Sequence, residues 1–133
     1  MNAELKDIVR GCSIASDEGR VGFGEVVATL SAAGVERYHA DLVRAEKTYY
    51  LPDGTSELVP NAEIAVAPAQ QFSASAVAQT IKAIQAGTID YRTFCDRVVS
   101  AGCVAYVVSI VGRRAVYYGR TGDSHVEWFP GAT

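Results

Sequence analysis

The sequence predicts an α+β fold in which two helix-helix-strand-strand-strand repeats share one antiparallel sheet, with the helices packed on it. Two observations predict this class. The chain aligns with itself at an offset of 68 positions without a gap, and in each half two helical patterns precede three short strand patterns. Helices followed by hairpin-linked strands are typical of an antiparallel sheet, whereas alternating strands and helices would indicate parallel βαβ units.

The internal repeat rests on glycines and tyrosines rather than on overall identity, since residues 1–60 and 69–128 share eleven identities. Six of these are landmarks that recur in both halves: Gly19/Gly87, Gly34/Gly102, Gly54/Gly122, Tyr38/Tyr106, Tyr49/Tyr117 and Tyr50/Tyr118. A repeat of this length predicts the same elements in each copy. We therefore expect a single domain over residues 1–133, with repeats at about 1–60 and 69–130, a linker over 60–72 and a pseudo-twofold relation.

Four apolar stripes at helical spacing predict two helices in each half. The stripes are Leu5/Ile8/Val9/Cys12, Phe23/Val26/Val27/Leu30, Val77/Ile81/Ile84 and Tyr91/Phe94/Val98. Gly34 and Gly102 follow the second helix of each half, where a left-handed cap residue is expected. Asp90 is placed to cap the fourth helix at its N-terminus.

Each half continues with three strand patterns. Strands are expected over residues 35–43, 46–51, about 55–59, 103–111, 114–119 and 124–129. Residues 103–111 are apolar on both faces, which predicts a central strand buried on both sides. Gly112-Arg113 fits a two-residue hairpin loop, and the repeat then predicts an equivalent loop at Arg44-Ala45.

Composition and charge exclude several classes of protein. With 49% hydrophobic and 20% charged residues, the 133-residue chain has an ordinary globular balance. No run approaches the roughly 18 apolar residues of a membrane span, and residues 1–10 lack the apolar centre of a signal peptide. Three cysteines without a C-x-x-C favour reduced thiols in the cytoplasm. Neither common glycine-rich nucleotide motif occurs, so no cofactor is expected.

Several short motifs resemble those of one bacterial family. They are Ala33-Gly34…Tyr38-His39-Ala40-Asp41, Thr48-Tyr49-Tyr50-Leu51-Pro52-Asp53-Gly54, Ala86-Gly87-Thr88-Ile89, Ala101-Gly102-Cys103-Val104 and Tyr118-Gly119-Arg120-x-Gly122-Asp123-x-His125-x-Glu127-x-Phe129-Pro130. With these motifs the chain resembles the YdfO-like family of enterobacterial, prophage-associated proteins, some of which carry the label phage envelope protein. The resemblance covers nearly the whole chain. It implies a small α+β fold of unknown function and transfers no catalytic residue.

His39 and Asp41 stand two apart on an expected strand, so both side chains point to the same face. With the Arg44-Ala45 loop, His39 would face Tyr50 across the hairpin. Such a group could perform general acid–base chemistry. The alternative, which we favour, is a polar strand face that meets water near a sheet edge.

His125 and Glu127 also share a strand face, and Trp128 lies opposite. They form either a second acid–base pair, which could meet His39 across the pseudo-twofold, or the charged face of an edge strand. Two isolated histidines do not supply the converging ligands of a metal site. Arg120 could bind an oxyanion, but the same turn recurs in the first half without an arginine, which favours a plain hairpin turn.

The tyrosines and cysteines are expected in the core. The repeated tyrosines Tyr38, Tyr49, Tyr106 and Tyr117 could line a pocket together with Trp128, but their symmetry favours equivalent places in a shared core. Cys12, Cys95 and Cys103 lie among apolar residues, which favours small core hydrophobes over nucleophiles.

Three functions remain open. We favour a non-enzymatic module that binds a protein partner or itself, as a homodimer through a sheet edge or a helix face. The alternative is a small-molecule-binding protein or an enzyme with His39, Asp41 and Tyr50 in a cleft. Nucleic-acid contact through Arg113, Arg114 and Arg120 is the third, against which the net charge of −3 argues. Local function should lie where the halves differ, so the candidate ligand-binding residues are His39, Asp41, Tyr50, Arg120 and His125.

Overall fold

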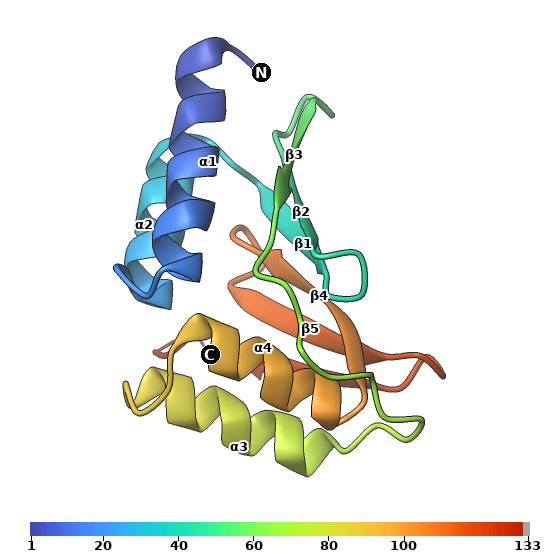
Figure 1. Ribbon diagram of the computed structural model, residues 1–133. Coiled ribbons are helices and arrows are strands. Elements are labelled where there is room, and N and C mark those ends of the chain that lie inside the picture. Colours follow the sequence, from blue (N-terminus) through green and yellow to red (C-terminus); the bar gives the residue numbers. More distant parts are fainter. Residues whose placement is uncertain (132–133) are drawn as a thin grey trace.

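The computed structural model describes residues 1–131 and confirms the α+β class (Figure 1). Each half contributes two helices and then three strands. The elements are α1 (Ala3–Asp17), α2 (Phe23–Ala32), β1 (Arg37–Asp41), β2 (Glu46–Tyr50), β3 (Ser56–Pro60), α3 (Ala74–Gln85), α4 (Tyr91–Ser100), β4 (Cys103–Ser109), β5 (Arg114–Gly119) and β6 (Ser124–Trp128). Asp90 caps α4 as expected, because its carboxylate accepts a hydrogen bond from the Thr93 amide at 2.8 Å.

The six strands form one antiparallel sheet in the order β3-β2-β1-β4-β5-β6. The first strands of the two halves, β1 and β4, pair with each other in a register that runs from Arg37 opposite Ser109 to Asp41 opposite Ala105. The strand order is symmetric about this pair. The two repeats therefore share one sheet, with the pseudo-twofold axis between β1 and β4.

Backbone conformation repeats together with topology. Eight of the nine left-handed residues within residues 1–131 occur in pairs separated by 68 positions: Gly19 and Gly87 (φ 72° and 75°), Gly34 and Gly102 (86° and 96°), Ala45 and Arg113 (56° and 57°), Gly54 and Gly122 (89° and 87°). Three of these pairs are glycines, which adopt positive φ at little cost. The offset seen in the sequence thus describes equivalent turns in the two halves.

The four helices cover one face of the sheet (Figure 1). Tyr38, Tyr49, Tyr106 and Tyr117 point to this face and join one hydrophobic core cluster that draws on both halves. Cys95 and Cys103 are buried in the same cluster, and Cys12 packs against it half-buried. The expected core role of these residues is confirmed.

In the described part of the chain, residues 1–131, no helix covers the second, outer face of the sheet (Figure 1). β4 is central, as predicted, but the prediction that it is buried on both sides is wrong, since Ala105, Val107 and Ser109 are only half-buried on the outer face. The outer face also carries partly or fully exposed residues of the other strands: Arg37, His39, Asp41, Thr48, Tyr50, Leu58, Val116, Tyr118, Val126 and Trp128.

The β1–β2 and β4–β5 loops differ from the prediction. Asp41 pairs with Glu46 and Ser109 with Arg114, so each loop has four residues rather than two. The last residue of each loop, Ala45 or Arg113, adopts the left-handed conformation. In the predicted two-residue turn Gly112 would have been the first loop residue. Because the loop is longer, His39 pairs with Thr48, not with Tyr50; β1 is a central strand, not one near an edge.

Residues 61–73 join the halves without helix or strand and pack closely on the second half. The Ser73 amide donates to the Ala101 carbonyl at 2.8 Å. A Cβ atom on Gly102 would lie 2.3 Å from the carbonyl oxygen of Gln71, and one on Gly119 would lie 2.8 Å from Phe72. The bare backbone at these glycines lets the connecting segment cross the ends of β4 and β5.

Within residues 1–131, no helix combines the length and the apolar character that crossing a bilayer requires.

The repeat supplies a matched test of this crossing. Gly34→Ala and Gly102→Ala both force alanine into a left-handed backbone, which costs about 1–2 kcal/mol, but only Gly102 lacks space for a methyl group. We expect Gly102→Ala to lower the free energy of unfolding by about 2 kcal/mol more than Gly34→Ala. Urea denaturation of both variants measures this. Equal losses would show that the connecting segment is not held at Gly102.

Candidate functional site

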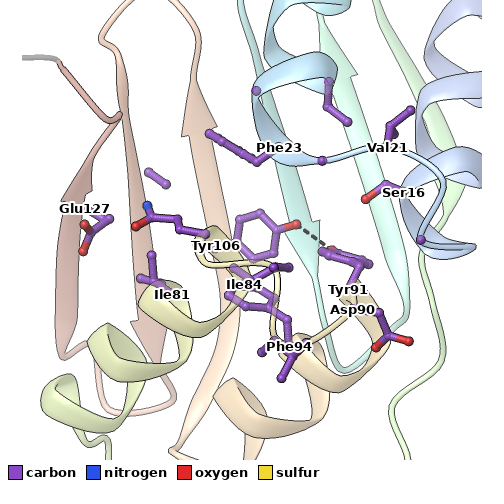
Figure 2. A pocket seen from close by; sticks show the side chains of 18 of the residues that line it. Ser16, Val21, Phe23, Ile81, Ile84, Asp90, Tyr91, Phe94, Tyr106 and Glu127 are labelled. Carbon is purple, nitrogen blue, oxygen red and sulfur yellow. Dashed lines mark hydrogen bonds between the residues drawn. The ribbon is translucent and has the colours of Figure 1, made fainter.

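A cavity of about 1060 Å³ lies between the two helix pairs and the covered face of the sheet (Figure 2). It exists because α1 and α2 sit over the first half while α3 and α4 sit over the second (Figure 1). The helices of the two halves meet where Arg92 Nε donates to the Asp17 carbonyl at 3.2 Å. Away from this contact the pairs diverge and leave the middle of the sheet open to the cavity.

The floor of the cavity is built from the repeated tyrosines. Tyr49, Tyr38, Tyr106 and Tyr117 come from the four central strands, and all four line the cavity. The ring centroids are 5.1 Å apart for Tyr38 and Tyr49, and 5.2 Å apart for Tyr106 and Tyr117, with equal interplanar angles of 33°. These tyrosines both belong to the hydrophobic core and line the cavity, because one surface of the core forms the cavity floor.

The walls are mainly apolar. Ile81 and Ile84 of α3 face Phe23 of α2 across the opening, and Phe94 of α4 lies beneath Tyr106 in Figure 2. Phe23 packs edge-on against Phe129, with ring centroids 5.3 Å apart, so the end of the chain closes one side. Such a lining favours ligands that bury hydrocarbon or aromatic surface.

A hydrogen-bonded pair of tyrosines crosses the cavity. The hydroxyls of Tyr91 on α4 and Tyr106 on β4 are bonded to each other, as the dashed line in Figure 2 marks. Tyr91 also donates to Asn61 Oδ1 at 2.8 Å. At the position equivalent to Tyr91 the first half has Phe23, which has no hydroxyl. This polar contact therefore belongs to the second half alone.

Lys47 places a buried amine beside the cavity. Its side chain is 3% exposed, and Nζ donates to Ser13 Oγ at 3.1 Å and to Asp17 Oδ1 at 3.2 Å. Nζ also lies 4.6 Å from the centroid of the Tyr91 ring. Burial lowers the pKa of Lys47, and the Asp17 carboxylate opposes this shift. The ion pair and the hydroxyl of Ser13 keep the buried charge compensated.

The thiols near the cavity are poor nucleophiles. Burial raises the pKa of Cys95 to about 11 and the pKa of Cys103 to about 11. The pKa of Cys12, which lines the cavity, is raised for the same reason. Because the thiolate is the reactive form, all three side chains act as small apolar groups near neutral pH.

His39, Tyr50 and Asp41 lie on the outer face of the sheet, away from the cavity. The His39 and Tyr50 rings are 4.9 Å apart, although the residues are not paired. Arg37 Nη1 donates to His39 Nε2 at 2.6 Å, and burial together with this arginine lowers the pKa of His39. Asp41 accepts from the amides of Val43 and Arg44, both at 3.1 Å, and so holds the hairpin loop.

Arg120 and His125 lie on the second half and contact different neighbours. Arg120 Nη2 donates to the Pro68 carbonyl at 2.7 Å and ties the β5–β6 turn to the connecting segment. His125 Nε2 lies 3.0 Å from Glu127 Oε1 on edge strand β6. His125 points to the helix-covered face and His39 to the outer face, so the two histidines do not meet across the pseudo-twofold, as one of the two interpretations had allowed.

Among residues 1–131, no three side chains of the metal-binding types gather closely enough to hold an ion.

Sequence reasoning missed Lys47 and Tyr91, although the repeat carries the signal for both. The equivalent of Lys47 is Ala115, and the equivalents of its partners Ser13 and Asp17 are Ile81 and Gln85. A search for positions where the halves differ in charge finds this group as readily as it finds His39. It was missed because a lysine within Glu46–Tyr50 is typical of an exposed strand.

Residues 22–126 match the sequence model of the family described as "Protein of unknown function (DUF1398)". The matched part begins just before α2 and ends within β6, so it includes the tyrosine floor and most of the walls. No curated protein matches the chain.

The buried tyrosines make stability fall at alkaline pH. Burial raises the pKa of Tyr38, Tyr49, Tyr91, Tyr106 and Tyr117 above the ordinary value of 10.0. Above pH 10 the unfolded chain therefore holds fewer protons than the folded one, and the free energy of unfolding falls as pH rises. Each buried tyrosine contributes about 1.4 kcal/mol per pH unit to this fall in the free energy of unfolding.

Two buried thiols and one buried amine modify this pH dependence. Cys95 and Cys103 add a loss of the same sign from their ordinary value of 9.0 upward, while Lys47 opposes it only below its ordinary value of 10.5. Urea denaturation between pH 9 and 11.5 measures the slope. We expect Tyr117→Phe to make the slope shallower, because it removes one of the buried hydroxyls, and Tyr118→Phe, on the outer face, is the control variant. Stability that is constant above pH 10 would contradict the burial of these hydroxyls.

Proposed function

The chain belongs to the DUF1398 family, whose function is unknown, and from the geometry of its cavity we propose that it binds a small, largely apolar molecule. One observation carries the proposal: a cavity of about 1060 Å³ with an aromatic floor, apolar walls and a few polar groups. Pockets of this size and lining are the usual sites of small organic ligands. The divergence of the two helix pairs keeps the cavity open without any rearrangement.

The repeat explains how such a site arises. Both halves supply equivalent tyrosines to the floor, while the polar groups at its sides, Lys47 and Tyr91, have no equivalent in the other half. The tyrosines that occur in both halves thus form the floor of the cavity. Lys47 and Tyr91, which occur in one half only, make the lining of the cavity asymmetric. This asymmetry is what recognition of an unsymmetrical molecule requires.

Three expectations from the sequence remain parts of the proposal. They are a single domain over residues 1–133, a cytoplasmic location, and kinship with the prophage-associated YdfO-like proteins. One core cluster built from both halves supports the first, and three free cysteines support the second. Acid–base chemistry by His39, Asp41 and Tyr50 stays a prediction, against which the loop contacts of Asp41 weigh.

Self-association is a second candidate function, favoured by the uncovered outer face of the sheet. Six strands about 4.8 Å apart, with five residues of about 3.4 Å each, give a face of about 25 by 17 Å. That footprint, about 425 Å², is about half of the roughly 800 Å² that each subunit of a standard dimer buries, so a dimer would also use residues beside the sheet. The apolar part of this face, Val107, Val116 and Val126, crosses the strands of the second half. We propose that a second copy covers it, since a twofold dimer sets this strip against itself.

The cavity proposal predicts binding of N-phenyl-1-naphthylamine, a neutral dye that brightens in apolar surroundings. Gly24 on α2 lines the cavity, and neither it nor Gly11 on α1 has an atom within 4 Å of an added Cβ. We expect Gly24→Trp to weaken dye binding about tenfold, or ~1.4 kcal/mol, by filling the cavity.

Gly11→Trp is the matched control, because it adds the same side chain to a helix away from the cavity and should leave dye affinity unchanged. A fluorescence titration measures both variants. Equal affinities for the two variants would place the dye elsewhere, and a lack of dye binding to the native chain would contradict the proposed function.

The dimer proposal predicts a mass near twice 14.1 kDa in light scattering at high protein concentration. Val126→Glu, on the outer face, should return the protein to a monomer, because it places a charge within an apolar interface. Val111→Glu, in the exposed β4–β5 loop, is the control and should leave the dimer intact. A native chain that stays monomeric at the highest soluble concentration would exclude self-association.

A further inference from the structure

We propose that the ligand of the cavity is a neutral molecule with a hydrogen-bond acceptor such as a carbonyl oxygen, which the hydroxyls of Tyr38 and Tyr117 bind. This inference rests on the proposed function and names the chemical class of ligand for the same cavity. Two independent features of the lining carry it: the hydroxyl groups of the floor and the balance of charge around them.

Two of the floor tyrosines carry hydroxyls that have no partner within residues 1–131. Tyr38 is 4% and Tyr117 is 6% exposed, and neither hydroxyl takes part in a hydrogen bond. Within the same residues, no fully shielded side-chain oxygen or nitrogen lacks a partner. The two hydroxyls are therefore not fully shielded, and their side chains line the cavity, to which we infer that they are open.

Both hydroxyls can donate a hydrogen bond to a ligand. Burial raises the pKa of both tyrosines, so both are protonated at neutral pH. A phenolic hydroxyl enclosed by apolar side chains gains most from a partner that accepts its proton, because little water competes there. The other two floor hydroxyls are less available, since Tyr106 is bonded to Tyr91 and the hydroxyl of Tyr49 interacts with Ser13.

Among the described lining residues, the one buried cation is already paired. The buried amine of Lys47 is paired with Asp17 at 3.2 Å, and Glu127 Oε1 lies 3.0 Å from His125 Nε2. The remaining charged groups of the lining are exposed at the rim and of both signs: Arg20, Asp90 and Arg97. An anion deep in the cavity would lose its hydration while the arginines of the lining stay at the exposed rim, so the arrangement favours a neutral molecule over an anion.

Three dyes with naphthalene rings separate these features. 6-Propionyl-2-dimethylaminonaphthalene is neutral and has a ketone, and its emission shifts to the red when the ketone accepts a hydrogen bond. N-phenyl-1-naphthylamine is neutral without a ketone, and 1-anilinonaphthalene-8-sulfonate is its anionic derivative. We expect the native chain to bind both neutral dyes, and to bind the sulfonate at least tenfold more weakly than its neutral parent.

The variants Tyr38→Phe, Tyr117→Phe and their combination remove the hydroxyls and keep the rings. Each loss should weaken binding of the ketone dye about threefold, and both together about tenfold, with an emission shift to the blue. Binding of N-phenyl-1-naphthylamine should not change. Tyr118→Phe, on the outer face, is the control, and the near-ultraviolet circular dichroism of each variant reports whether the core is intact.

The outcomes separate this inference from the function on which it rests. If the neutral dyes bind but the ketone dye does not respond to loss of either hydroxyl, the hydrogen bonds are absent and the inference is wrong. The inference also fails if the sulfonate binds as tightly as its parent. If no neutral dye binds, the proposed function itself fails. The single variants decide the matter even if the double variant does not fold.

Discussion

The pairing of β1 with β4 is the contact on which the rest of this structure depends. It joins two copies of a unit of about 60 residues, which would be marginal alone because so small a chain buries too little of its surface. It also sets Tyr38 and Tyr106 side by side in the middle of the sheet, with ring centroids 6.3 Å apart. The helices follow their own halves, so the cavity forms above the junction.

The features that both halves share specify the fold, whereas the buried polar groups beside the cavity occur in only one half. The left-handed turns, the strand order and the floor tyrosines are common to both halves and specify the fold. The buried ion pair of Lys47 with Asp17 and the hydroxyl of Tyr91 occur once. A buried polar group needs hydrogen-bond partners, and here Ser13 and Asp17 supply them to Lys47 and Asn61 supplies one to Tyr91. Several differences between the halves at residues that contact one another therefore indicate a candidate site better than a difference at a single position does.

The sequence predicted most of the fold, because the glycine and tyrosine landmarks of the repeat mark equivalent turns and strands. It failed at the hairpin loops, where Ala45 and Arg113 adopt the left-handed conformation that propensity assigns to glycine. It also failed at the outer face of β4, because an apolar strand does not reveal whether helices cover one side or both. The ion pair of Lys47 could not be predicted from local sequence patterns, because its partner Asp17 lies 30 positions earlier in the chain.

The central claim is that the covered face of the sheet, and not its outer face, binds a small molecule. Methyl signals in nuclear magnetic resonance spectra test it most directly during titration with N-phenyl-1-naphthylamine. The account predicts shifts for Val26, Ile81 and Ile84, which line the cavity, and none for Val107, Val116 and Val126 on the outer face. Shifts confined to the three outer-face valines would contradict it.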